Sequence, residues 1–479
     1  MAGRPAQSDP SRSTPSRADA TQPGLAQFAS SQSGPPQTHE EAQREFALTL
    51  SAFSSTDNPR YEDYSRCIHC GLCLNHCPTY RLWGAEADSP RGRIRQILLV
   101  DQGRLELGAS FVTHIDRCLD CRACETACPS GVEYGKLVEL ARAQIEQKYK
   151  RPFVSRVARN FVYRRLLPNR RRIATLARVA RFYQTSGLAS LARATGLLRL
   201  FGMEDRERLM PKIDRDFFFS DLGKTFPAQG PRRARVAFFA GCIAQVTFSE
   251  LNRATIRVLQ ANGCEVVVPA AQVCCGALPA HAGVRDVARD LAQKNFAAFD
   301  GAEAGAFDAI LTNAAGCGST LKEYPHLFEE GSSEAKNAVR FSAQVRDVTE
   351  FLADLGLAGP LREVPLRVTY QDSCHLAHGQ KIREAPRKLI RAVPGVELIE
   401  MQLSDLCCGS AGVYNVTQTK ASLDLLAEKM DAVAQTKTRA IVTANPGCMI
   451  QLRAGAAIHG TGHEVLHVVE LLDRALVKN

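Results

Sequence analysis

The second half of the chain alternates short apolar runs with longer stretches of helical periodicity. The apolar runs are rich in β-branched residues and end at Gly, Pro or a polar residue, which predicts buried strands. Helical stretches between strands predict βαβ units, and therefore parallel sheets and an α/β fold. The six predicted strands occupy residues 236–241, 265–269, 309–313, 366–371, 396–401 and 440–445.

This half of the chain is also a repeat. Four cysteines of the first copy recur in the second copy at offsets of 131 to 133 residues, and each copy contains the sequence Cys-Cys-Gly. We call the copies the first and second CCG domains. A later matching pair, beginning at Val345 and Val465, is offset by only 120 residues, so we expect an insertion in the first copy, within residues 322–344.

The first half has a helical pattern instead. Ser89 followed by Pro90 predicts the start of a helix, and helical periodicity continues to Val100. A second amphipathic helix is expected over 131–149, and a further helix from His39 onward. The fold class that follows is α/β with an α-helical N-terminal part.

Changes in composition divide the chain into segments. The first 44 residues are rich in Ser, Pro, Gln and Thr and carry few large apolar side chains, which predicts disorder. The predicted segments are a disordered tail (1–44), a helical ferredoxin domain (45–150), a basic helical linker (151–230), the first CCG domain (231–358) and the second CCG domain (359–479).

The positive charge of the chain belongs to the linker. The formal net charge is +10, and residues 151–216 alone carry 16 Lys and Arg against 5 Asp and Glu, a net of +11. A solvated arginine face on a linker bundle explains this most simply, and a membrane-surface helix or a docking face for an acidic partner are the alternatives. Nucleic-acid binding is not expected, because no recognised binding motif accompanies the charge.

Two cysteine runs in the helical domain carry the clearest chemical signal. Each reads C-x2-C-x2-C-x3-C-P, the spacing of bacterial ferredoxins that ligate [4Fe–4S] clusters. In two-cluster ferredoxins the fourth cysteine of each run serves the other cluster. We therefore predict two [4Fe–4S] clusters, one held by Cys67, Cys70, Cys73 and Cys128 and the other by Cys118, Cys121, Cys124 and Cys77.

Zinc is the alternative occupant of a four-thiolate site. Structural zinc sites usually combine two separated C-x2-C pairs, whereas each run here has three closely spaced cysteines followed by a fourth and a proline. The spacing therefore favours iron–sulfur clusters, and two clusters in one chain indicate electron transfer.

The CCG domains carry a second set of cysteines. In each domain they follow a predicted strand or stand at a predicted helix start, which is the sheet edge where α/β folds place ligands. Each copy is a candidate metal or redox site, alone or jointly with the other copy, and inert buried thiols are the alternative. The candidates are Cys242, Cys274, Cys275 and Cys317 in the first domain and Cys374, Cys407, Cys408 and Cys448 in the second.

Other residues near these positions are left out of the candidate set. Cys264 occurs in the first copy only and is expected to be a buried apolar residue. His281, His375 and His378 lie near the same sheet edges, but a lone histidine beside a cysteine is more often a packed or capping residue. We predict no catalytic residue in this chain.

Composition also restricts the compartment. The 17 cysteines of this 479-residue chain cluster in metal-ligand spacings, which indicates reduced thiols and a reducing compartment. The N-terminus shows no apolar signal-peptide region, and no apolar run approaches the roughly 18 residues of a membrane-spanning helix. No dinucleotide fingerprint or phosphate-binding loop is present. We expect a cytoplasmic protein with at most peripheral membrane association.

The motifs together resemble a known group. Two ferredoxin runs followed by two CCG domains resemble the heterodisulfide-reductase-like iron–sulfur proteins, and within that group the iron–sulfur subunits of bacterial glycolate oxidases. The matching stretches are CPTYRLWGAEADSPRGRI, DSCHLAHGQKIREAPRKLI, CCGSAGVYNVTQ and NPGCMIQLRAG. The resemblance covers the chain from about residue 45 to the end.

The resemblance implies a partner complex. Flavoprotein subunits would bind FAD and oxidise glycolate to glyoxylate, and this chain would pass the electrons to a membrane acceptor of quinone type, at the cytoplasmic face of the inner membrane. In heterodisulfide reductases the full CCG motif ends in C-x-x-C and builds a noncubane cluster. Here Cys317 and Cys448 stand alone at that place, so an ordinary four-thiolate site, or no metal, remains open.

Three further functions compete with this one. Sister families with the same layout serve lactate or glycerol 3-phosphate dehydrogenases. The CCG cysteines would also suit a disulfide or quinone reductase. The third is a regulatory protein that binds nucleic acid through the basic segment.

Overall fold

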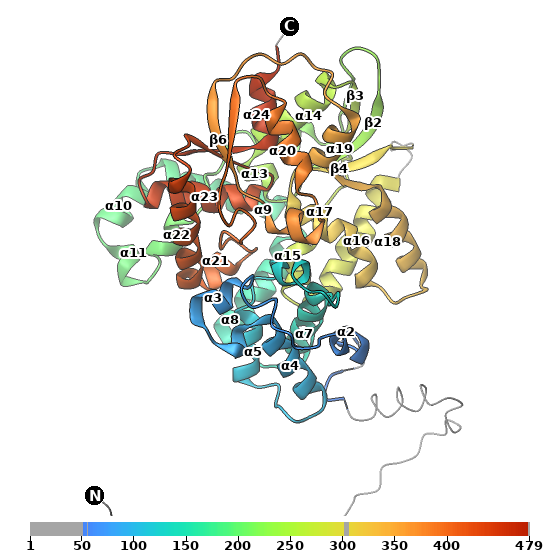
Figure 1. The fold of residues 1–479 in the computed structure, drawn as a ribbon, viewed down its shortest axis with the longest axis vertical. Coiled ribbons are helices and arrows are strands. Elements are labelled where there is room, and N and C mark those ends of the chain that lie inside the picture. Colours follow the sequence, from blue (N-terminus) through green and yellow to red (C-terminus); the bar gives the residue numbers. More distant parts are fainter. Residues whose placement is uncertain (1–50, 55, 301–305, 478–479) are drawn as a thin grey trace, which may run out of the picture. The chain divides into compact units, whose positions relative to one another are not determined.

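The computed structural model describes residues 51–54, 56–300 and 306–477. The predicted tail and the helix predicted from His39 lie outside these residues. The predicted fold class is confirmed: a helical N-terminal part precedes two α/β domains (Figure 1). The segment boundaries predicted above stay predictions.

The ferredoxin module is built from short helices around two cysteine loops. Helix α4 begins as predicted at Ser89 and Pro90, because the Ser89 hydroxyl accepts a hydrogen bond from the backbone N–H of Gly92 at 3.0 Å and caps the helix. The helix predicted over 131–149 is also present. The elements are α2 (Tyr61–Ser65), α3 (Pro78–Trp83), η1 (Glu86–Asp88), α4 (Pro90–Asp101), α5 (Ala109–Asp116), α6 (Ala123–Thr126) and α7 (Tyr134–Lys148).

The linker is helical and its helices are short. Helix α9 begins after Asn169, whose side chain accepts a hydrogen bond from the N–H of Arg172 at 3.1 Å. It turns Ile173, Ala174 and Ala177 inward. The linker elements are α8 (Phe153–Arg159), η2 (Asn160–Leu166), α9 (Arg170–Thr185), α10 (Leu188–Ala194), α11 (Leu197–Leu200), α12 (Glu204–Arg208) and η3 (Phe218–Asp221).

The first CCG domain holds a five-stranded sheet of order β1-β3-β2-β4-β5. Four strands are parallel, as predicted. The short edge strand β1 was not predicted, and it runs antiparallel to β3. The strands are β1 (Thr225–Phe226), β2 (Ala234–Phe239), β3 (Cys264–Val267), β4 (Ala309–Thr312) and β5 (Val345–Asp347). The helical elements are α13 (Ala244–Thr247), α14 (Ser249–Ala261), α15 (Ala277–His281), α16 (Arg285–Asp300), α17 (Ala315–Lys322), η4 (Tyr324–Leu327), α18 (Ser333–Gln344) and α19 (Val348–Leu355).

The second CCG domain repeats this arrangement with four parallel strands of order β7-β6-β8-β9. The strands are β6 (Leu366–Tyr370), β7 (Val396–Glu400), β8 (Ala440–Thr443) and β9 (Glu464–His467). The helical elements are η5 (His375–Gly379), α20 (Glu384–Arg391), α21 (Tyr414–Thr417), α22 (Thr419–Gln435), α23 (Pro446–Ile458) and α24 (Val468–Ala475).

The repeat is longer in the first copy, as expected. Its extra residues form η4 and α18, whereas in the second copy α23 leads to β9 without another helix. The two domains share one apolar core, to which β2 contributes Val236 and β6 contributes Val368. Helix α14 of the first domain packs against α24 of the second, as Figure 1 shows near the C-terminus.

The ferredoxin module packs directly against the first CCG domain. Helices α7 and α15 are in contact, and Gly283, just after α15, lies against the backbone of Arg142 in α7. A Cβ atom at Gly283 would stand 2.3 Å from the Arg142 carbonyl oxygen, and its φ of +83° also favours glycine. This close approach fixes the side of the ferredoxin module that faces the first CCG domain.

Candidate metal centres

The two cysteine runs fold into loops with the same backbone conformation. Two and four residues after the first cysteine of each run, φ is positive: +55° at His69 and +83° at Gly71, and +54° at Asp120 and +61° at Arg122. Such turns direct successive N–H groups to one side of the loop. In the second loop the N–H of Asp120 donates to the Cys118 sulfur at 3.3 Å. Both loops are therefore shaped to surround an anionic group.

The first group of cysteines lines a cavity that opens to solvent. We call the set Cys67, Cys70, Cys73 and Cys128 the outer site; Cys124 also reaches this cavity, and Ile94, Val132 and Tyr134 complete its apolar side. Cys70 is exposed and the other three are half-buried. Ile68 and Leu72, on the same loop, are 69% and 58% exposed.

The second group lines a neighbouring buried cavity. We call the set Cys77, Cys118, Cys121 and Cys124 the inner site, and all four cysteines are buried. Thr79, Arg93 and Tyr134 lie against it. The structure thus brings together both predicted sets, including the fourth cysteine from the opposite run. Their role as ligands stays a prediction.

The residues present fit [4Fe–4S] clusters. All the metal-binding groups in each set are thiols, with apolar side chains around them. Four thiolates on one zinc ion, with Zn–S bonds of about 2.3 Å, would stand about 3.8 Å apart. In the described part of the chain no three cysteine sulfurs lie within 4.8 Å of one another. The spacing of the cysteines along each run is the argument for an iron–sulfur cluster.

Burial favours the protonated form of Cys73, Cys121 and Cys124 in the absence of metal. Burial raises the pKa of Cys73 to about 11, and it raises the pKa of Cys121 and Cys124 well above the usual value. Iron must therefore displace the protons when a cluster forms.

Buried ion pairs stand beside the inner site. The Arg93 side chain is fully buried and lies 3.4 Å from the Asp88 carboxylate, which also receives Arg117 at 2.9 Å and His114 at 2.9 Å. Thr79 accepts a hydrogen bond from Arg93 at 3.1 Å and lies 3.2 Å from the Cys77 sulfur. The network fixes the fourth cysteine of the first run.

The four cysteines of the first CCG domain meet at the carboxyl edge of its sheet. The sulfur of Cys242 lies 3.3 Å from that of Cys274, and thiol hydrogen bonds link Cys275 to Cys274 and to Cys317. The sulfurs form a chain rather than a tetrahedron. They pack with Tyr163 and Leu167 of the linker, among other apolar residues.

The four cysteines of the second CCG domain form an equivalent chain. Hydrogen bonds join Cys374 to Cys407, Cys407 to Cys408, and Cys408 to Cys448. Cys374 and Cys407 also belong to an apolar cluster with Cys121 of the inner site. Among the described cysteines of the CCG domains, those of the second domain therefore adjoin the ferredoxin module.

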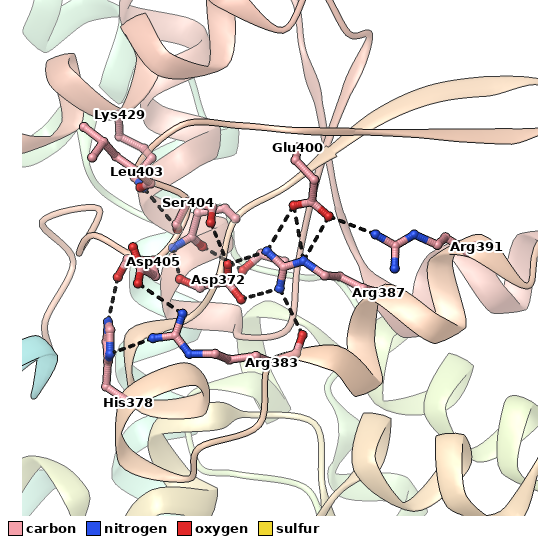
Figure 2. A network of polar contacts seen from close by, with 12 residues as sticks. Asp372, His378, Arg383, Arg387, Arg391, Glu400, Leu403, Ser404, Asp405 and Lys429 are labelled. Atoms are coloured by element: carbon pink, nitrogen blue, oxygen red, sulfur yellow. Dashed lines mark hydrogen bonds and ion pairs between the residues drawn. The ribbon is translucent and has the colours of Figure 1, made fainter. Parts of the chain in front are cut away.

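A polar network holds the loops that carry Cys374 and Cys407 (Figure 2). Arg387 of α20 binds the Asp372 carboxylate with two hydrogen bonds of 2.8 and 2.7 Å, and donates to Glu400 at 3.0 Å. Ser404 donates to Asp372 at 2.8 Å. Because Asp372 stands two residues before Cys374, these bonds fix that cysteine.

The same network reaches the loop before Cys407. Arg383 donates to the Asp405 carboxylate at 3.1 Å, and His378 lies 2.9 Å from the Asp405 carbonyl oxygen. The other ring nitrogen of His378 is 2.9 Å from the Thr126 hydroxyl of the ferredoxin module. His378 thus bridges the loop before Cys407 and the ferredoxin module, whereas a packed or capping role was expected from the sequence.

A second buried network joins the inner loop to both CCG domains. The Nδ1 atom of His281 lies 2.6 Å from the Glu139 carboxylate and 3.2 Å from that of Asp120. Nε2 of His375 lies 2.8 Å from the Asp120 carbonyl oxygen. Arg122 of the inner loop forms an ion pair with Glu323 of the first domain.

The charges around His281 determine whether this network can bind a metal ion. Burial alone would lower the pKa of His281, but hydrogen bonds to Asp120 and Glu139 outweigh it and raise the pKa to about 9. Arg122 and Arg142 approach the same carboxylates within 3.8 to 4.0 Å. His281 is therefore a cation shared by two carboxylates, and the nearby guanidiniums oppose a metal ion there.

Sequence reasoning missed this network. Asp120 and Arg122 stand inside the second run where the first has His69 and Gly71. A charged pair in the second loop was the only local signal. Some of its partners, Glu139 and Arg142, lie in α7, but His281, Glu323 and His375 are more than 100 residues away in the CCG domains.

Known families match the three parts of the chain. The description "4Fe-4S dicluster domain" matches residues 63–132, and "Cysteine-rich domain" matches 236–322 and 368–453. The description "Glycolate oxidase iron-sulfur subunit, linker region" matches 154–210. The chain is thus an iron–sulfur protein.

Relatives match over most of the chain. It is 38% identical over 413 residues to the "Probable glycolate oxidase iron-sulfur subunit" of Bacillus subtilis, covering 85% of this chain and 92% of the relative. It is 34% identical over 418 residues to the "Glycolate oxidase iron-sulfur subunit" of Escherichia coli, covering 86% and 94%. The "Lactate utilization protein A" of Oceanobacillus iheyensis is 29% identical over 240 residues, or 50% of this chain and 96% of the relative.

Proposed function

Because the chain belongs to the family of glycolate oxidase iron–sulfur subunits, we propose that it is the electron-transfer subunit of a flavin-dependent glycolate oxidase. Flavoprotein partners hold the FAD and oxidise glycolate to glyoxylate, and this chain passes the electrons to a membrane acceptor of quinone type. Two [4Fe–4S] clusters, when bound at the outer and inner sites, supply one-electron carriers. The observation that carries the proposal is the assembly of eight cysteines around two neighbouring cavities.

The surroundings of the sites orient the chain in the complex. The outer site is the only one of the two with an exposed cysteine, and Ile68 and Leu72 offer apolar contact beside it. A redox partner therefore meets the loop around Cys70. The inner site is covered by the second CCG domain and serves internal transfer. The complex works at the cytoplasmic face of the membrane.

Anaerobic purification of the full chain with its flavoprotein partners tests the proposal. We expect about eight iron atoms per chain and two reducible paramagnetic centres. Glycolate should reduce both centres only when the flavoproteins are present. An iron-free chain that still supports full turnover would overturn the proposal. For the cysteine-to-serine variants described below, Cys264→Ser is the matched control, because Cys264 is buried in β3 outside the candidate sets.

A disulfide or quinone reductase acting at the CCG cysteines is the second candidate function. The chain of hydrogen-bonded thiols and its contact with the inner site favour it. Cys408→Ser should then abolish reduction of the acceptor while the ferredoxin spectrum stays intact, and Cys275→Ser tests the first domain in the same way. Unchanged turnover in both variants would exclude it.

The substrate is assigned by relationship, since this chain does not contact the hydroxy acid. The intact complex should reduce its acceptor with glycolate faster than with lactate or glycerol 3-phosphate. A preference for lactate would assign lactate as the substrate, in line with the lactate utilization relatives.

A further inference from the structure

One stretch of the linker combines positive charge with exposed apolar side chains. Residues 151–201 contain twelve arginines and no aspartate, glutamate or lysine. Helices α9, α10 and α11 lie within this stretch and pack one against the next. Figure 1 shows α10 and α11 at the edge of the view, beside the second CCG domain. We call residues 170–201 the α9–α11 surface.

Helix α9 is apolar on two sides. Ile173, Ala174 and Ala177 face inward, as in any packed helix. Leu176, Val179 and Phe182 lie on the opposite face and are exposed, Phe182 at 63%. Residues at intervals of three form one stripe along a helix. A second apolar stripe facing outward has no role in the core of this chain.

Helices α10 and α11 continue this exposed apolar area. Leu191, Leu200 and Phe201 are exposed, Leu200 at 78%. In all, eight of the twenty-four large apolar side chains that are exposed in the described part of the chain belong to the α9–α11 surface. A concentration of this kind marks an interaction site rather than scattered surface residues.

Arginines flank the outward stripe of α9. Arg171, Arg172 and Arg178 are exposed, and none forms an ion pair with a carboxylate among the described residues. Arg171 and Arg172 stand in the first turn of the helix, where the helix dipole disfavours positive charge. Arg172 donates to the Arg165 carbonyl oxygen at 2.9 Å and Arg178 lies over the Phe217 ring, but the charge of these exposed guanidiniums is not balanced by a carboxylate of the described residues, so we look for an anionic ligand.

The charge pattern together with the apolar stripe favours a lipid surface over a protein partner. Complementary potentials meet across protein interfaces, so a protein partner would need an acidic patch of matching extent. A stretch of 51 residues without a single acidic side chain matches a surface that is anionic everywhere. Apolar side chains bordered by arginines on in-plane helices are typical of helices that lie in a membrane interface. No helix of the described residues is long and apolar enough to cross a bilayer.

We propose that the α9–α11 surface binds the anionic face of a phospholipid bilayer. Leu176, Val179 and Phe182 enter the boundary between headgroups and acyl chains. Arg171, Arg172 and Arg178 reach the lipid phosphates, with their aliphatic parts along the apolar surface. The proposal concerns attachment, so it can fail or succeed independently of the electron-transfer function.

Vesicle flotation with the full chain, purified anaerobically, tests the proposal. The probes are vesicles of phosphatidylcholine alone and of phosphatidylcholine with phosphatidylglycerol. We expect binding to the anionic vesicles only, and weaker binding as salt is added. Each arginine near an anionic surface strengthens binding about 5-fold, so R171Q/R172Q/R178Q should weaken it on the order of 100-fold. L176S/V179S/F182S should weaken it about 10-fold or more.

Matched variants control for charge and folding. R95Q/R104Q/K420Q removes the same charge from exposed positions outside the surface and should bind as the unchanged chain does. Val339→Ser is the exposed apolar control. Iron content and thermal unfolding should be unchanged in all of them.

Three results would overturn the proposal. The first is equal binding to neutral and anionic vesicles. The second is an equal loss of binding in the charge control. The third is normal vesicle binding by the surface variants together with a loss of assembly with the flavoprotein subunits, which would make this surface a protein interface.

Discussion

The outer and inner sites are built from the same motif and differ in almost everything around it. Their loops share the same positive φ positions, and each receives its fourth cysteine from the other run. The outer site opens to solvent beside Ile68, Cys70 and Leu72. The inner site is enclosed by the second CCG domain. The motif thus fixes the donor set, and the segments that pack over it decide what each site can contact.

The same contrast holds for charge. At the outer site, Arg91 forms an ion pair with Glu86 at 2.7 Å on the surface. At the inner site, Arg93 and Asp88 are fully buried, and His281 bridges two buried carboxylates at the far side of the loop. Water screens the outer charges, whereas the inner charges depend on one another.

The strongest test of the contrast replaces one cysteine at each site. Both Cys70→Ser and Cys121→Ser should lower the iron content by about four atoms per chain and stop glycolate-dependent reduction of the acceptor. Cys121→Ser should also lower the free energy of unfolding by about 1–3 kcal/mol, because it places a hydroxyl group in a buried apolar cluster, whereas Cys70 is exposed. Iron analysis, turnover and thermal unfolding measure these effects. Equal destabilisation by both variants would contradict the assignment of Cys121 to a buried inner site and of Cys70 to an exposed outer site.

The two ion pairs offer a second test. Asp88→Asn leaves Arg93 buried beside a neutral group and should cost about 3–5 kcal/mol of stability. Glu86→Gln, the matched change at the surface pair, should leave thermal unfolding nearly unchanged. The cost of Asp88→Asn should shrink in an Arg93→Met background, since the two groups interact. A similar cost in both backgrounds would show that Asp88 acts through other contacts.

The inner network should also make stability depend on pH. The pKa of His281 is about 9 in the folded chain and about 6.5 in the unfolded chain. A raised pKa contributes stability that is fully present below pH 6.5 and is lost as the pH rises through 9. We expect a fall in unfolding free energy of about 1–3 kcal/mol across this window.

Denaturant unfolding at a series of pH values measures this fall. His281→Gln should remove it and lower stability at neutral pH. His459→Gln, at an exposed position, is the control and should keep the pH dependence. If the pH dependence of stability persists in His281→Gln, then groups other than His281 cause it.

The smallest expected effect concerns the outer rim. Ile68→Ser and Leu72→Ser should slow reduction by the flavoprotein partner about 3- to 10-fold, because each removes apolar contact beside the exposed site. Iron content and thermal unfolding should stay the same. Stopped-flow reduction by the flavoprotein measures the rate, with Val339→Ser as the exposed control. Unchanged rates would place the partner elsewhere on the chain.

Local patterns of the sequence were enough for much of the fold. All six predicted strands are present, and the helix start at Ser89 and Pro90 is confirmed. Strands β5 and β9 were recognised as a matching pair at Val345 and Val465 but not as strands, because each apolar run is short and continues into a helix. The antiparallel edge strand β1 carries too few residues for a periodic signal.

The sequence by itself determined the cysteine sets, the repeat and the alternation of strands and helices, because these depend on spacing and on the nearest neighbours along the chain. Only the tertiary structure decided that one site is buried, that the second CCG domain adjoins it, and that His281 is a cation between Asp120 and Glu139. These features arise between segments more than 100 residues apart. Burial and charge are properties of such contacts, and no local pattern records them.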